Sequence, residues 1–82
     1  MKFESIDVQC YSGYKINETP RSFIYRNRRR TIVEIPDRWY EGGRDWKIMG
    51  TDFFKVTTDT GETFIIRYQG LLDRWSVMIA AE

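Results

Sequence analysis

The sequence predicts an all-β domain of about six antiparallel strands, arranged as a small barrel or a strongly curved meander sheet. Apolar residues alternate with polar ones in most segments, and turn-forming residues separate these segments. No window of a dozen residues carries a helical stripe, so at most one short helical turn is expected, near residues 70–75. The chain has 82 residues, so we expect residues 1–82 to form a single β domain.

The strands are expected near residues 3–11, 21–26, 29–39, 51–58, 62–69 and 74–80. In the first, Ile6, Val8 and Cys10 alternate with polar residues, which assigns all three to the buried face. Short links between the last three strands favour an antiparallel meander. Pro36 cannot donate to a neighbouring strand, so it should lie at an edge or a bulge of the third strand. The irregular segment 40–50 carries Trp46 and is expected to fold back onto the barrel.

The charge distribution is uneven along the chain. Residues 21–33 carry five arginines and no acid, whereas the whole chain has a formal net charge of +1. Guanidinium groups bind phosphate and carboxylate through paired donors, which makes part of this stretch a candidate nucleic-acid or anion-binding site. The alternative is a tight hairpin tip that needs only solvated side chains. The candidate residues are Arg26, Arg28, Arg29 and Arg30.

Two registers are open for this hairpin. A two-residue loop at Asn27-Arg28 sets Arg26 opposite Arg29 and requires a positive φ at Arg28, which a residue with a Cβ adopts poorly. A three-residue loop at 27–29 sets Arg26 opposite Arg30 instead. We prefer the three-residue loop because it gathers apolar residues on one core face: Phe23, Tyr25, Val33 and Ile35.

The preferred register also predicts an outward surface. It places Ile24 and Ile32 on the outer face beside the arginines. Adjacent aromatic residues of a strand point to opposite faces, so one of Trp39 and Tyr40, and one of Phe53 and Phe54, should face outward. An exposed apolar patch of this kind would suit a protein partner. The candidate partner surface consists of Ile24, Ile32, Trp39 and Tyr40.

The sequence offers little for catalysis. It contains no histidine and a single cysteine, Cys10, and it has no Walker loop, dinucleotide fingerprint or metal-ligand spacing. We therefore expect a non-enzymatic protein without a cofactor or a metal. The absence of an apolar stretch typical of a signal peptide or a membrane span favours a cytoplasmic protein, either a monomer or a weak dimer.

The spacing of aromatic and turn residues resembles a family of short bacterial β domains of uncharacterised function, whose pattern is similar to P-x-x-F-x-[WY]-x-G-R-R-x-x-V with a later Trp. The positions that carry the likeness, over roughly residues 18–80, are Pro20, Phe23, Tyr25, Asn27-Arg28, Val33, Trp39, Trp46, Phe54-x-Val56 and Arg74-Trp75. Asn27 replaces the usual glycine, but asparagine also tolerates positive φ. Thr31 stands where an aromatic or basic residue is common. Some members are encoded beside, or fused to, translesion DNA polymerases, which implies association with nucleic acid or a polymerase.

Two functions follow as expectations. The first is a binding module that contacts nucleic acid through the 21–33 hairpin, with an accessory role in DNA repair if the family resemblance extends to function. The second is a protein-interaction or self-associating domain that uses an exposed strand edge and the Ile24/Ile32 surface.

Overall fold

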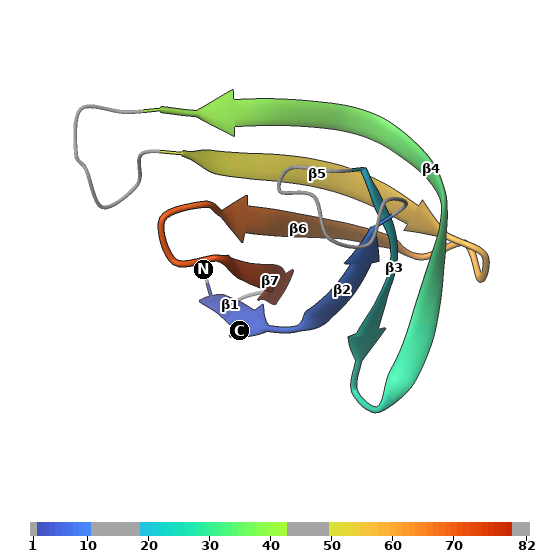
Figure 1. Ribbon diagram of the computed structural model, residues 1–82. Helices are drawn as coiled ribbons and strands as arrows, with labels where there is room; N and C mark the ends of the chain where they lie inside the picture. Colours follow the sequence, from blue (N-terminus) through green and yellow to red (C-terminus); the bar gives the residue numbers. More distant parts are fainter. Residues whose placement is uncertain (1, 11–18, 43–49, 80–82) are drawn as a thin grey trace.

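The computed structural model describes residues 2–10, 19–42 and 50–79, and these form one antiparallel sheet of seven strands that curls into a half-barrel (Figure 1). The predicted all-β class is confirmed, and the described part of the chain contains no helix. The order across the sheet is β1-β7-β6-β5-β4-β3-β2. The strands are β1 (Lys2–Ser5), β2 (Asp7–Cys10), β3 (Pro20–Tyr25), β4 (Arg28–Glu41), β5 (Thr51–Thr58), β6 (Thr63–Gln69) and β7 (Arg74–Ile79).

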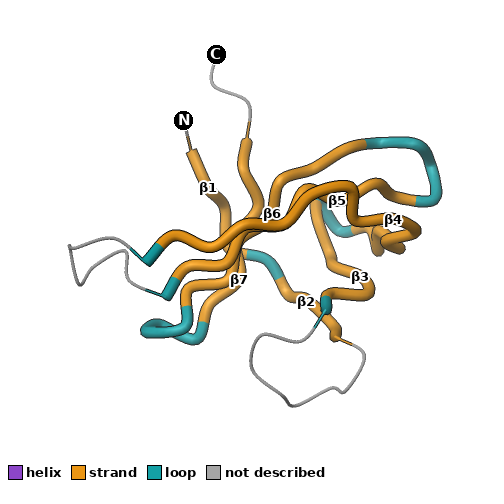
Figure 2. Tube along the Cα trace, turned by 90° about the horizontal axis from the view of Figure 1, so that it is seen from above, coloured by secondary structure: helices purple, strands orange, loops and turns teal. Residues whose placement is uncertain are grey.

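The predicted first strand is divided in two at Ile6. Its first half, β1, pairs with β7, whereas its second half, β2, pairs with β3 at the other end of the sheet. The backbone N–H of Ile6 donates to the carbonyl of Trp75 at 3.1 Å, so the break itself is anchored to β7. Figure 2 shows β1 running beside the last strand. The two ends of the sheet are therefore consecutive in the chain.

The long strand β4 bends and serves two neighbours. Its first residues pair with β3, and the rest pair with β5. Register shifts between Ile32 and Glu34 and between Glu34 and Asp37 mark the bend, and Pro36 lies within the second shift. The predicted position of Pro36 at a bulge is confirmed, because an irregular stretch of ladder requires no N–H there. The predicted meander of the last three strands is also confirmed.

The core lies inside the curl of the sheet. Five hydrophobic side chains from β3, β5, β6 and β7 are at most 1% exposed and form its centre: Phe23, Phe54, Val56, Ile66 and Val77. Each contributes roughly 1.5–3 kcal/mol by leaving water. Ile32 and Ile35 pack against this cluster, as do Ile6 and Val8. Ile6, Val8 and Cys10 are all half-buried and alternate with exposed Asp7 and Gln9, as predicted.

The predicted core face is wrong at Val33, whose side chain is 61% exposed. Ile32 and Ile35 pack against the core in its place, because the register shift between Ile32 and Glu34 changes which residues of β4 face the core. The prediction for the segment 40–50 concerns Trp46 and its neighbours, which lie outside the described residues. Among the described residues, no helix could cross a membrane.

Candidate nucleic-acid interface

The arginine hairpin turns one residue earlier than either predicted register. Tyr25 pairs with Arg28, which leaves Arg26 and Asn27 as a two-residue turn. Both turn residues are left-handed, with φ of 55° and 62°, as in a type I′ turn. This register avoids the like-charge pairs of Arg26 with Arg29 or Arg30. Asn27 adopts the expected positive φ, but the other turn residue with a positive φ is Arg26, not Arg28.

The observed register divides the four arginines between the two faces of the sheet. Arg28 and Arg30 lie opposite Tyr25 and Phe23, on the face that carries the core. Arg29 lies opposite Ile24 on the outer face. There its guanidinium donates to the side-chain oxygens of Gln9 at 3.1 Å and Ser22 at 3.2 Å. The four arginines therefore do not form one patch.

The arginines of the inner face and the turn gather around Tyr25. The Arg26 guanidinium carbon lies 5.1 Å from the centre of the Tyr25 ring, and that of Arg30 lies 5.5 Å from it. Tyr25 in turn packs edge-on against Phe64, with ring centres 5.6 Å apart. A hydrogen bond to Tyr25 and the nearby carboxylate of Glu4 raise the pKa of Arg26. Tyr25 thus backs a guanidinium that is exposed at the tip of the hairpin.

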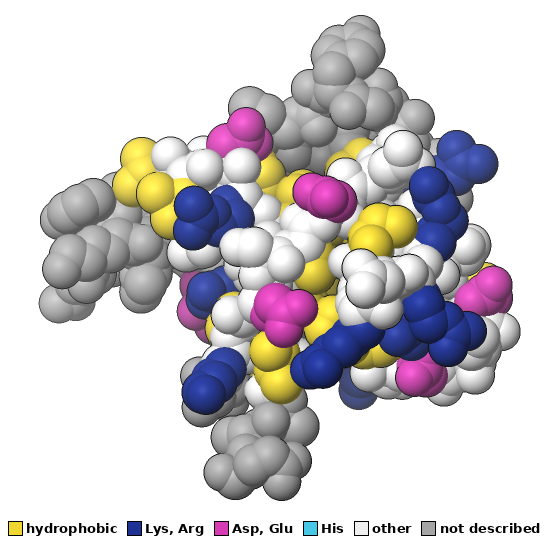
Figure 3. Space-filling view, turned by 90° about the horizontal axis from the view of Figure 1, so that it is seen from below, with side chains coloured by type: hydrophobic (Ala, Val, Ile, Leu, Met, Phe, Trp, Pro, Cys, Tyr) yellow, Lys and Arg dark blue, Asp and Glu magenta, His cyan; other side chains and the backbone are white. Residues whose placement is uncertain are grey.

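The positive charge of this group is only partly neutralised. Arg30 is half-buried and forms an ion pair with Glu62 on the β5–β6 turn, where the same carboxylate accepts from Thr60 Oγ1. Arg28 is exposed and makes no hydrogen bond or ion pair with the described residues. Figure 3 shows a band of Lys and Arg side chains across this side of the molecule, with single Asp and Glu side chains beside it. Arg26 and Arg28 are accordingly the cations best placed to meet an anion.

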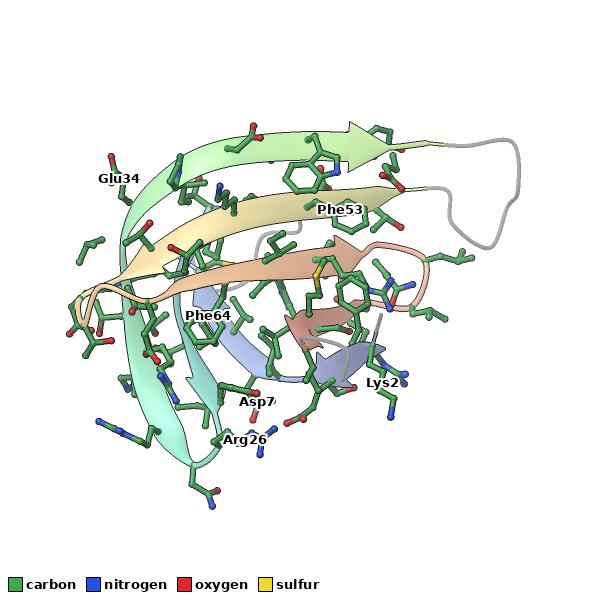
Figure 4. All side chains as sticks on the ribbon, turned by 180° about the vertical axis from the view of Figure 1, so that it is seen from behind. Lys2, Asp7, Arg26, Glu34, Phe53 and Phe64 are labelled. Carbon is green, nitrogen blue, oxygen red and sulfur yellow. The ribbon has the colours of Figure 1, made fainter. Side chains whose placement is uncertain are left out.

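An acidic hollow lies next to the hairpin turn. It has a volume of about 340 Å³ and opens between the turn and the break that separates β1 from β2. Figure 4 shows Asp7 and Arg26 beside each other at this mouth of the half-barrel. The sequence does not predict the hollow, because the hollow depends on the break at Ile6. The uninterrupted alternation of apolar residues gives no sign of that break. Its lining residues are Glu4, Ser5, Ile6, Asp7, Ile24, Arg26 and Asn27.

The structure does not bring the candidate partner surface together. Ile24 is 37% exposed on the outer face, whereas Ile32 packs against the core. The predicted pairing of these two isoleucines is wrong because the turn begins one residue earlier. Trp39 and Tyr40 point to opposite faces as expected, with Tyr40 60% exposed opposite Asp52.

Trp39 belongs to a row of aromatic side chains on the outer face of the sheet. Its ring is parallel to that of Phe53, with an interplanar angle of 1° and centres 5.2 Å apart. Phe53 meets Phe3 edge-on at 6.4 Å, and the Arg67 guanidinium lies 3.6 Å from the centre of the Phe3 ring. Burial lowers the pKa of Arg67. Because these side chains cover one another and are half-buried, they pack as a second small cluster. Phe54, by contrast, is fully buried, so the pair Phe53 and Phe54 divides as predicted.

The free edge of β4 carries features that hinder strand pairing. β3 covers this side of β4 only as far as Thr31, and beyond Thr31 no described strand pairs with the side of β4 that faces away from β5. Asp37 Oδ1 already accepts from the backbone N–H of Arg38 at 2.8 Å, and Pro36 and the register shifts precede it. In a symmetric pairing of two copies centred on Trp39, Asp37 would face Glu41 on the same face, and like charges would repel. Such features are typical of edges that are protected against association.

The fold and this surface define a small all-β half-barrel with a projecting basic hairpin beside an acidic hollow. No protein-family model matches the chain, and no similar curated protein or solved structure was found. The resemblance to the family of bacterial β domains therefore stays a prediction from the sequence.

Proposed function

We propose that the protein is a non-enzymatic module that binds single-stranded nucleic acid through the tip and inner face of its arginine hairpin. The observation that carries this proposal is the contact of the Arg26 guanidinium with the Tyr25 ring, beside an exposed Arg28 that lies opposite Tyr25 in the hairpin. Guanidinium planes provide stacking surfaces for bases, and guanidinium groups also bind phosphate. In this arrangement Arg26, supported from behind by the Tyr25 ring, offers a base-stacking surface, and Arg28 contacts the phosphate backbone.

A single strand fits this surface better than a duplex. The exposed guanidinium groups sit at one narrow turn, and with Arg26 assigned to stacking, Arg28 contacts about one phosphate. Binding should then depend weakly on salt, with a slope of about −0.7 in a plot of log K against log salt, since each contact to a single strand contributes about −0.7. The accessory role in DNA repair belongs to this proposal through the family resemblance.

The proposal is tested by titrating the protein with fluorescently labelled single-stranded dodecamers between about 25 and 200 mM salt and measuring anisotropy. Arg28→Gln should weaken binding roughly fivefold, because it removes one phosphate contact. Arg29→Gln is the matched control: it removes the same charge from the same hairpin, but from the outer face. It should leave the affinity within about twofold of the original.

A third variant tests the inner face through an expected gain of affinity. Glu62→Gln releases Arg30 from its ion pair, so the affinity should rise about twofold to fivefold. The free energy of unfolding should fall by about 1 kcal/mol or more, because the Arg30 side chain is only 13% exposed and would lose its ion-pair partner, Glu62. Undetectable binding at the lowest salt would contradict the proposal. An equal loss of affinity in the Arg28→Gln and Arg29→Gln variants would contradict the assignment of the inner face.

The competing hypothesis of a protein-interaction or self-associating domain has less support. Its apolar surface is divided between two faces of the sheet, and the free edge of β4 carries the protective features described above. A dimer that is insensitive to salt in size-exclusion chromatography would nevertheless favour it over nucleic-acid binding.

A further inference from the structure

We propose that the acidic hollow beside the hairpin turn is a base pocket, which selects nucleobases that carry an amino group over uracil and thymine. The inference rests on the proposed function, because it assigns to the same surface the part of the nucleic acid that enters the hollow.

The hollow has the composition of a site for a flat, polar ring. Its volume of about 340 Å³ lies in the range of about 300–1,000 Å³ that is usual for ligand pockets. Ile6 and Ile24 provide an apolar lining, whereas Glu4 and Asp7 provide hydrogen-bond acceptors. Arg26 completes the wall on the side of the hairpin, and its guanidinium is the group that we assign to base stacking.

The charges of the hollow determine which part of a nucleotide can enter. Two carboxylates repel a phosphate, so the backbone must stay outside, near Arg28. A carboxylate accepts hydrogen bonds from the amino group of cytosine, and an adenine or guanine amino group can donate in the same way. Uracil and thymine present a carbonyl oxygen at the corresponding position of the ring. That oxygen is an acceptor, so it cannot bond to a carboxylate and is repelled by it.

The position of Arg26 connects base stacking with the hollow. The guanidinium of Arg26 contacts the Tyr25 ring, Arg26 is one of the residues that line the hollow, and the Glu4 carboxylate lies close enough to raise the pKa of Arg26. A base that stacks on Arg26 would therefore enter a hollow lined by Glu4, which lies opposite Val77 on the core face, and by Asp7, which lies opposite Ile24 on the outer face. This arrangement explains why acidic side chains lie directly beside a basic hairpin, where they would otherwise oppose phosphate binding.

The test compares labelled dC and dU dodecamers, which share the deoxyribose backbone and differ along one edge of the base: cytosine has an amino group at C4 and no proton on N3, whereas uracil has a carbonyl at C4 and a proton on N3. Anisotropy titrations of the two oligonucleotides are made at the same pH and salt concentration. We expect the dC oligonucleotide to bind at least about fivefold more tightly, since a correct base contact contributes about 1–3 kcal/mol of discrimination.

Asp7→Asn should abolish this preference, because the amide can also donate to the carbonyl of uracil. The affinity for dU should rise, while that for dC changes little. Asp59→Asn removes the same charge from an exposed position on the β5–β6 turn and is the matched control; the preference for dC should persist in it. Glu4→Gln provides a second variant in case Asp7→Asn is unstable, and a thermal melt of each variant confirms folding.

The outcomes separate the two proposals. Failure of the original protein to bind either oligonucleotide at low salt would overturn the proposed function and the pocket together. Equal binding of dC and dU by the original protein would overturn the pocket and leave nucleic-acid binding intact. A preference for dC that survives both Asp7→Asn and Glu4→Gln would also overturn the pocket.

Discussion

Tyr68 is the residue whose surroundings most clearly make the stability of the protein depend on pH. Its side chain is 3% exposed, and its hydroxyl donates to Asp73 Oδ1 at 2.6 Å. Asp73 is left-handed, with φ of 49°, so this hydrogen bond stabilises a strained position in the β6–β7 turn. Burial, and then the hydrogen bond to Asp73, raise the pKa of Tyr68 to about 12.

The raised pKa predicts a loss of stability in alkaline solution. An unfolded tyrosine has a pKa of about 10, so the stabilising effect is complete below about pH 10 and disappears as the pH rises toward 12. The free energy of unfolding should fall by roughly 2 kcal/mol over this range. Tyr68→Phe should remove that part of the pH dependence and cost about 1–2 kcal/mol at neutral pH. Urea unfolding of both proteins from pH 8 upward measures this; identical alkaline slopes would refute it.

At the scale of elements, strands were more predictable than the turn between two of them. Alternation and turn residues identify where the strands lie because burial of one face imposes a period of two, although β1 and β2 are predicted as one strand. The hairpin register depends instead on whether Asn27 occupies the first or the second turn position, and both fit its tolerance of positive φ. The choice decides which arginines share a face with Tyr25. The sequence therefore predicts the arginines of the candidate site, but not their division between faces.

We expect Arg26 to lower the stability of the hairpin turn while its guanidinium serves binding. Arg26 adopts φ of 55°, a conformation that costs a residue with an ordinary side chain about 1 kcal/mol or more. Arg26→Asn should raise the free energy of unfolding by about 0.5–1 kcal/mol, because asparagine suits both positions of a type I′ turn. The same change should weaken oligonucleotide binding, since it removes the guanidinium that contacts Tyr25.

Asn27→Gly is the control for this prediction. It relaxes the neighbouring turn position, φ of 62°, and leaves the charge unchanged, so the protein should gain stability and keep its affinity. Urea midpoints and anisotropy titrations of both variants give the two readouts. A less stable Arg26→Asn variant would mean that the contacts of Arg26 with Tyr25 outweigh its backbone strain.

At the scale of the whole molecule, the acidic hollow is a product of how the sheet ends meet. β1 and β2 are consecutive in the chain yet lie at opposite ends of the sheet, and only the break at Ile6 lets the same segment serve both. The sequence predicts one continuous strand here, because Ile6, Val8 and Cys10 keep their alternation through the break. Local periodicity carries no information about which distant strand each half pairs with, so the hollow could not be predicted.

Closure through β1 should be essential for the stability of this small domain. The pairing of Lys2–Ser5 with Ser76–Ile79 covers the edge of β7. Deletion of residues 2–5 should cost on the order of 2–4 kcal/mol in backbone hydrogen bonds alone, a large share of the 5–15 kcal/mol that is typical of folded domains. The exposed edge of β7 should also pair between molecules.

Thermal melts and size-exclusion chromatography at several protein concentrations would measure both effects. The deletion variant should melt earlier and associate as the concentration rises. Glu4→Gln, which alters the charge of β1 but keeps the strand, should behave as the original protein does in both measurements. A deletion variant that stays monomeric with an unchanged melting temperature would show that β2 alone, held by β3, is enough to complete the half-barrel. In that case the hollow should lose its Glu4 wall while the hairpin still binds nucleic acid, so the preference for dC would weaken without a loss of salt-dependent affinity.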